Sequence, residues 1–235
     1  MMMRFLTGVG YQSLFSIVLL GLLSSSCSLS EPRAMLNPRA AAKARIRLGL
    51  AYLAQGELPL AQQNLEQALQ YQPKNSQALR AMAYYQQQAG EPQSAKIYYQ
   101  QALQQTPRDG QLLHQYADFL CQQRCYPEAQ RYFTAALQAP GYTQMAATFQ
   151  QSGFCYLLAG DTRAAKQKLE RALRHHPAQS KEWIRWAHQA VDKAQIQQAA
   201  ELLTIYHTLQ PNTPESLYLQ QRIATRLAEL PTIQQ

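Results

Sequence analysis

Four cysteines are the residues of this 235-residue chain with the widest scope for chemistry. Cys27 directly follows three serines at the end of an apolar stretch, whereas Cys121, Cys125 and Cys155 lie in the middle of the chain. Such thiols can be acylated, oxidised to disulfides or used to bind zinc. The central three have no C-x-x-C pair to combine with a histidine, which argues against zinc. We therefore expect modified or cross-linked thiols, with no metal and no cofactor.

Other residue types with catalytic potential do not form a recognisable site. The chain has no Gly-rich phosphate loop, no H-E-x-x-H motif and no nucleophile elbow. His175 and His176 precede Pro177 at an expected helix end, where a surface turn is a simpler interpretation than a metal site. Trp183 and Trp186 lie three residues apart on one helix, and core packing is favoured over a ligand cage. We expect no catalytic residues, and an enzyme is the poorest interpretation.

The elements that carry these residues come from a 34-residue repeat. Small residues recur on the first expected helix of each copy, at Gly49, Ala83, Ala117, Gly153 and Ala187. A second small series follows on the second helix, at Ala61, Ala95, Ala129, Ala165 and Ala199. This spacing resembles the tetratricopeptide repeat, in which pairs of antiparallel helices stack on one another. The predicted fold is an all-α superhelix of about five to six helix pairs over residues 42–235.

Breaks between the helices fit the same pattern. Gly56, Gly90 and Gly160 stand where the first helix of a copy must end. Prolines such as Pro73 close the second helix. The step from the third copy to the fourth is 36 residues, because residues 139–142 lengthen that junction. A capping helix is expected over 214–229, and its apolar residues are Leu217, Leu219, Ile223 and Leu227.

The amino terminus has a different character. Arg4 precedes an apolar stretch over 14–23, and Ser24-Ser25-Ser26 leads to Cys27. This layout predicts a signal peptide over 1–26 and a tether over 27–41. The cysteine after small residues resembles a bacterial lipoprotein signal, although Ser24 replaces the usual leucine. An ordinary cleaved signal or an uncleaved anchor is the alternative. Acylation of Cys27 before Ser28 implies, by that resemblance, an anchor in the inner leaflet of the outer membrane, facing the periplasm.

Composition agrees with an exported domain. The net charge of +8 falls to +7 when Arg4 leaves with the signal. Export argues against nucleic acid as the partner, so an acidic partner or an anionic lipid surface is the better interpretation. A solvated basic exterior is the simpler alternative.

The repeat register bears on the central cysteines. Cys121 and Cys155 fall in the later halves of first helices of adjacent copies, which are expected to stack side by side. A disulfide between them is geometrically reasonable in an oxidising compartment. The rival pairing joins Cys121 to Cys125 across the turn between two helices.

Four segments of the sequence carry a more specific resemblance. Residues 37–69, 116–137, 149–173 and 215–228 resemble the PilF/PilW family of type IV pilus biogenesis lipoproteins, above all at Phe119-Leu120-Cys121 and Gly153-Phe154-Cys155. The resemblance implies a disulfide between those two cysteines. It also implies a pilotin-like protein that binds the pilus secretin and promotes its outer-membrane localisation and multimerisation. Cys125, and His114-Gln115 in place of an Asn-Asn pair, depart from the family. The alternative is a lipoprotein that scaffolds another envelope machine, such as cell-wall enzymes.

The resemblance to tetratricopeptide repeats predicts where a partner binds. The first helices of such repeats line a concave groove through the second, fifth, ninth and twelfth positions of each copy. Those positions are Lys43, Ile46, Leu50 and Leu53, then Gln77, Arg80, Tyr84 and Gln87, then Gln111, His114 and Asp118. Apolar anchors beside polar side chains suit a groove that grips a peptide. The alternative is that the apolar residues of the first copy only pack against the N-terminal tether.

Overall fold

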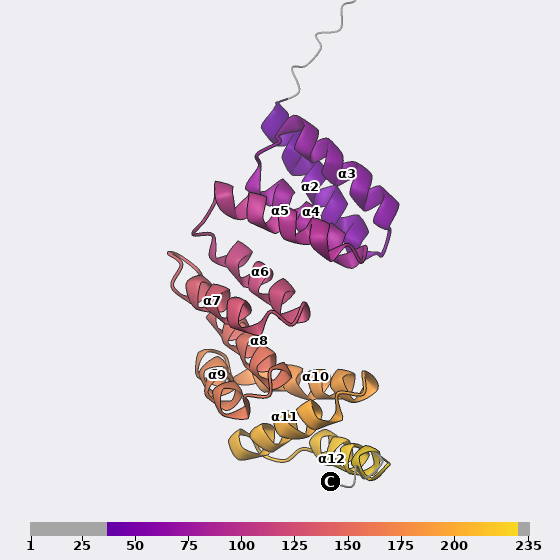
Figure 1. The fold of residues 1–235 in the computed structure, drawn as a ribbon, viewed down its shortest axis with the longest axis vertical. Helices are drawn as coiled ribbons and strands as arrows, with labels where there is room; N and C mark the ends of the chain where they lie inside the picture. Colours follow the sequence, from indigo (N-terminus) through magenta and orange to yellow (C-terminus); the bar gives the residue numbers. More distant parts are fainter. Residues whose placement is uncertain (1–36, 230–235) are drawn as a thin grey trace, which may run out of the picture. The chain divides into compact units, whose positions relative to one another are not determined.

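The computed structural model describes residues 37–229, and within that range the regular structure is helical. Five helix pairs follow one another along the chain and a single helix closes the series (Figure 1). The pairs are α2 Pro38–Ala54 with α3 Leu58–Tyr71, α4 Ser76–Gln88 with α5 Pro92–Gln105, α6 Gly110–Gln122 with α7 Tyr126–Leu137, α8 Met145–Leu158 with α9 Thr162–His175, and α10 Ser180–Asp192 with α11 Ile196–Leu209. The closing helix is α12 Pro214–Ala228, and a short 3-10 turn, Pro177–Gln179, precedes α10.

Short polar linkers precede α4, α6 and the closing helix α12. Asn75 and Asp109 cap α4 and α6, because their side chains accept hydrogen bonds from backbone N–H groups of the first turn. Thr213 forms a reciprocal capping box with Ser216 at the start of α12. Each cap satisfies donors that a helix N-terminus otherwise leaves unpaired. The linker between α7 and α8 is longer, as the 36-residue step predicts.

The turn inside each pair needs one residue with a left-handed backbone. Gly56, Gly90 and Gly160 supply it at φ of +78°, +79° and +82°. Arg124 and Ala194 occupy the corresponding place in the third and fifth pairs, at φ of +61° and +58°. The predicted glycine caps are therefore confirmed, and two side-chain-bearing residues adopt the same conformation at a steric cost.

Small residues bring the two helices of a pair together. A Cβ added to Gly49 would lie 2.6 Å from the Leu65 Cγ atom, and one added to Gly153 would lie 2.8 Å from the Leu169 Cγ atom. Ala61 and Ala165 on the facing helices have no exposed surface. The small positions of the repeat therefore permit the close approach of two backbones, as predicted.

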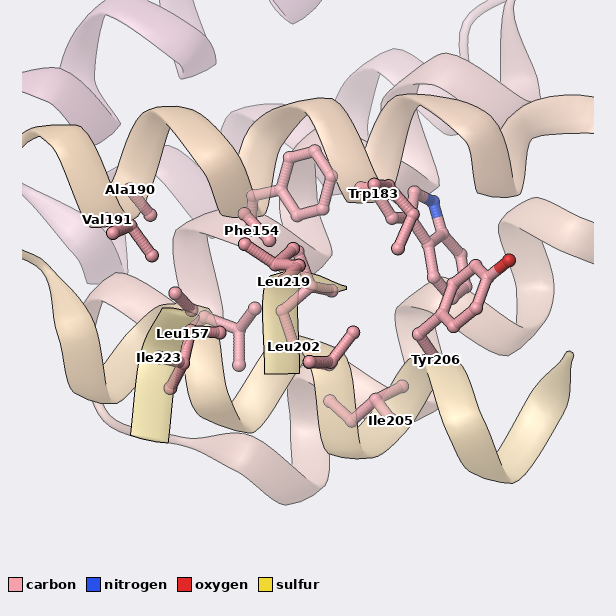
Figure 2. Close-up of a cluster of buried hydrophobic side chains, with 14 of the residues drawn as sticks. Phe154, Leu157, Trp183, Ala190, Val191, Leu202, Ile205, Tyr206, Leu219 and Ile223 are labelled. Carbon is pink, nitrogen blue, oxygen red and sulfur yellow. The ribbon is translucent and has the colours of Figure 1, made fainter. Parts of the chain in front are cut away.

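Apolar side chains between neighbouring pairs form the core. In the C-terminal part, Phe154 and Leu157 of α8 point toward side chains of α10, α11 and α12 (Figure 2). Trp183 is fully buried, and its indole N–H donates to the Gln150 carboxamide oxygen over 3.0 Å. The expectation that the tryptophans serve packing is confirmed for Trp183, while Trp186 stacks on Phe154 at the edge of the same cluster.

The start of α2 and the buried side of α12 differ from the sequence-based expectation. Helix α2 begins at Pro38, so the last four residues assigned to the tether are helical, and proline is well suited to a first helical turn. Of the apolar residues predicted for α12, only Leu219 and Ile223 are buried, whereas Leu217 and Leu227 are 49% and 39% exposed. A terminal helix contacts the array through one narrow stripe, which explains why half of its predicted apolar set faces outward.

Candidate partner-binding face and disulfide

A disulfide joins Cys121 at the end of α6 to Cys155 in α8. The two Cα atoms lie 5.8 Å apart, a separation typical of a disulfide. Both residues are buried, and the cluster around them includes Phe119, Leu120 and Tyr99. The bridge links the third helix pair to the fourth through their first helices.

Cys125 stays a free thiol in this arrangement. It is the residue before α7, half-buried in the turn after Arg124, and its Sγ atom lies 3.7 Å from the Gln123 carbonyl oxygen. The predicted signal peptide, Cys27 and most of the tether fall outside the described residues.

The four groove residues predicted on α2 fall into two groups. Lys43 and Leu50 are exposed on α2. Ile46 and Leu53 are only 7% and 9% exposed, and they pack with residues of α3 and α4 in the N-terminal core cluster. Ile46 and Leu53 are therefore core residues, because their places on α2 face the neighbouring helices. This burial leaves little of either side chain for a partner to contact, and their predicted role in binding stays a prediction.

Of the four groove positions on α4, Gln77 and Tyr84 are exposed and the other two are half-buried. Gln77 is exposed, and with Lys43 it lines a hollow over the linker between α3 and α4. Tyr84 is 41% exposed, which makes it an available aromatic anchor. The Arg80 guanidinium lies 4.0 Å from the Asp109 carboxylate, a loose ion pair near the start of α6. Gln87 donates to the Gln122 side-chain oxygen over 2.8 Å.

The groove positions of α6 are more enclosed. Gln111 is exposed at the start of the helix. The His114 Nδ1 atom lies 2.9 Å from the Thr148 hydroxyl oxygen, which in turn lies 2.6 Å from the Tyr142 hydroxyl. Asp118 accepts hydrogen bonds from Gln122 and, over 2.6 Å, from Gln151 of α8.

These contacts form a polar chain across three first helices. It runs from Gln87 of α4 through Gln122 and Asp118 of α6 to Gln151 of α8. Gln122 and Gln151 were not among the predicted residues. We define this set of four side chains as the polar chain. Gln87 and Asp118 are already engaged in these contacts, so the exposed Leu50 and Tyr84 are the more accessible anchors.

Burial shifts the pKa values of two side chains beside the polar chain. Removal from water lowers the pKa of His114 below its ordinary 6.5, and nearby Asp118 opposes that shift only in part. The pKa of Tyr99 is raised, chiefly by burial and then by the charge of Asp118. Tyr99 remains protonated and donates its hydroxyl hydrogen to Gln87 over 3.2 Å. The site is therefore a hydrogen-bonding surface with neutral buried members.

Residues 37–229 contain no group of three or more histidine, cysteine or acidic side chains placed to hold a metal ion. Over the same range, every helix is too short or too polar to span a bilayer.

Known proteins resemble this chain in sequence and in architecture, although no family model matches the sequence. An uncharacterised protein of Haemophilus influenzae is 34% identical over 156 residues, which cover 66% of this chain and 87% of that protein. The type IV pilus assembly protein PilF of Pseudomonas aeruginosa is 32% identical over 131 residues. That match covers 56% of this chain and 52% of PilF, so it spans about half the length of this relative.

Solved structures extend the likeness over most of the chain. Pseudomonas aeruginosa PilF superposes with a TM-score of 0.62 and 27% identity, over 81% of this chain and 86% of that one. PilW, described as a widely conserved type IV pilus biogenesis factor, gives 0.63 over 80% and 86%, and at 24% identity it shows the fold alone. The tetratricopeptide-repeat protein YrrB gives 0.52 at 17% identity, over 77% and 92%, again as evidence of fold. Sequence identity over part of the chain and common architecture over most of it make this a PilF/PilW-like tetratricopeptide-repeat protein.

Proposed function

We propose that this protein is a type IV pilus biogenesis lipoprotein that binds a secretin subunit and promotes its multimerisation at the outer membrane. The observation that carries the proposal is the likeness to PilF, which holds in sequence over part of the chain and in structure over most of it. Repeats of this kind act through protein contacts, which agrees with a role in assembly rather than catalysis.

The binding surface lies on the first helices of the N-terminal two pairs. Leu50 and Tyr84 are large side chains that stay 39% and 41% exposed. Gln77, seven residues before Tyr84 on α4, offers an exposed amide. An exposed leucine and tyrosine with polar neighbours match the make-up of a peptide-binding hot spot. An extended segment of the secretin inserts apolar side chains there and hydrogen-bonds to the polar rim.

Anchoring and binding act together in this mechanism. Acylation of Cys27 holds the protein at the inner leaflet of the outer membrane, and the repeats hold the secretin subunit close by. Confinement to a surface raises the effective concentration of subunits, which favours ring formation without a covalent step. The disulfide between Cys121 and Cys155 stabilises the repeats in the oxidising periplasm.

Deletion of the gene tests this function. We expect secretin monomers to accumulate in place of multimers, and twitching motility to be lost. The amount of secretin in each membrane fraction, separated by size, is the primary measurement. Normal multimers and motility with altered cell shape would contradict the proposal and favour a scaffold for cell-wall enzymes.

A further inference from the structure

The first helix, α2, concentrates positive charge at the end of the array that follows the predicted anchor. It contains Arg39, Lys43, Arg45 and Arg47 and no acidic residue. Arg45 donates to the buried Asn64 side chain over 3.0 Å and so serves the core. The other three are exposed and lie four residues apart, which sets them in one stripe along the helix.

A second stripe on α2 is apolar and also exposed. Ala40, Ala44 and Leu48 are again four residues apart, each one place after a basic residue. The two stripes therefore lie side by side on the helix. We call residues 39, 40, 43, 44, 47 and 48 the α2 face. Leu48 is 44% exposed within it.

The repeat itself shows that the Leu48 position is normally covered. The corresponding residues of the next two copies are Met82 and Tyr116, which are 2% and 0% exposed. Met82 packs in a cluster with residues of α2 and α3, and Tyr116 in a cluster with residues of α4 and α5. In both cases the preceding helix pair provides the cover. No described helix pair precedes α2, so this apolar slot is open.

The charge of the first helix pair and the length of the preceding chain bear on what covers the Leu48 position. Residues 38–75 contain five lysines and arginines (Arg39, Lys43, Arg45, Arg47 and Lys74) against two glutamates, Glu57 and Glu66. Glu57 lies after the C-terminal end of α2, and Glu66 accepts a hydrogen bond from Gln62 on α3. Ten residues lie between Cys27 and Pro38, and the eleven residue steps that join them span at most about 40 Å when extended. A lipid anchor at Cys27 therefore keeps the α2 face within reach of the bilayer surface.

We propose that the α2 face docks on anionic phospholipid headgroups, with Leu48 inserted at the interface and Lys43 and Arg47 paired with lipid phosphates. The inference rests on the membrane anchor of the proposed function. It adds that the protein lies against the bilayer in a defined orientation. A basic stripe beside an apolar stripe is the arrangement by which helices bind such surfaces.

Depth-dependent fluorescence quenching tests the docking. The chain from Cys27 to Gln235 contains all the helices and core clusters described above. In a Cys125→Ser background, Cys27 is coupled chemically to a maleimide lipid, so the result does not depend on acylation in the cell. Leu48→Trp is compared with Leu217→Trp, a similarly exposed leucine on α12. The vesicles contain phosphatidylethanolamine with either phosphatidylglycerol or phosphatidylcholine, and their acyl chains are brominated.

We expect the added tryptophan at position 48 to be quenched in phosphatidylglycerol vesicles and the one at 217 to be unaffected. Lys43→Gln with Arg47→Gln lowers the ratio of docked to undocked protein by roughly 25-fold, at about fivefold for each basic residue. The control, Arg131→Gln with Arg163→Gln, removes equal charge from exposed positions on α7 and α9 and leaves quenching unchanged.

Any one of four results overturns the inference. Quenching that is equal at positions 48 and 217, or that ignores lipid charge, shows that the α2 face has no role in orientation. Shielding of the residue-48 tryptophan without vesicles, in a protein that sediments as a monomer, assigns the face to residues 27–37 of the same chain. The same shielding in a dimer assigns it to a second copy. Failure of acylation in cells, by contrast, affects only the proposed function.

Discussion

Cys121 and Cys155 are bonded to each other across α6 and α8, although they occupy different places in the repeat. Cys121 lies four residues after the small residue Ala117, whereas Cys155 lies two residues after its counterpart Gly153. The step from the third copy to the fourth is two residues longer than the others, so a separation of 34 residues joins unequal positions. The bond therefore ties the third and fourth pairs together at the junction where the repeat is irregular.

Removal of this bond is expected to destabilise the protein. The disulfide closes a loop of 34 residues, for which the chain-entropy model predicts a loss of roughly 3–4 kcal/mol. Chemical denaturation of Cys121→Ala with Cys155→Ala measures it, and Cys125→Ala is the control that leaves stability nearly unchanged. Peptide mapping without reductant that finds both thiols free would remove the claim.

The turns inside the pairs predict opposite effects for two substitutions. Gly90 has φ of +79° with open space around its Cα, so Gly90→Ala costs about 1 kcal/mol through backbone strain alone. Arg124 has φ of +61°, so Arg124→Gly relieves strain and gains about 0.5 kcal/mol. Thermal unfolding of both variants checks the signs, and equal signs would refute the argument.

Half-buried His114 predicts a loss of stability in acid. Its pKa is lower in the folded protein than the ordinary 6.5, because burial disfavours the imidazolium. The unfolded chain thus binds the proton more readily, and the free energy of unfolding falls as pH drops below about 6.5 toward the folded pKa. His114→Asn removes this contribution and flattens the curve of stability against pH in that window. An unchanged slope in the variant would contradict the assignment.

Cys27 predicts the location of the protein. We expect Cys27→Ser to release the protein from the outer membrane or to leave it as an uncleaved precursor, since the acyl chains supply the anchor. Metabolic labelling with a fatty acid, followed by membrane fractionation, measures both effects. A wild-type protein that takes up no label would reject lipidation, and Cys125→Ser controls for acylation at another thiol.

The repeat made most of the fold predictable. Small residues, helix-ending glycines and a proline at fixed spacing leave few alternatives, because each of them meets a backbone constraint. The sequence pattern failed where exposure depends on what lies beside a helix. Ile46 and Leu53 share groove positions with exposed Leu50, yet their sides of α2 face α3 and α4. Position within one copy does not determine that difference.

The polar chain was equally hard to foresee. Gln122 and Gln151 are common surface residues in a chain rich in glutamine, and only the packing of α6 against α8 brings Gln151 to Asp118. Tyr142 is a further case. Its ring lies against Gly110, where an added Cβ would come within 2.6 Å. The lengthened junction was visible in the sequence, but the contact that it forms was not.

The most direct test of the proposed function is the secretin multimer content of cells that carry Leu50→Glu with Tyr84→Glu. The matched control is Leu60→Glu with Ile97→Glu, which places the same charges at exposed positions on the second helices of the same two pairs. Because all four side chains are exposed, we expect both proteins to keep their helicity and thermal stability. The account predicts that multimers are lost with the first pair of changes and retained with the control. Normal multimers with Leu50→Glu and Tyr84→Glu, or equal loss in both strains, would contradict it.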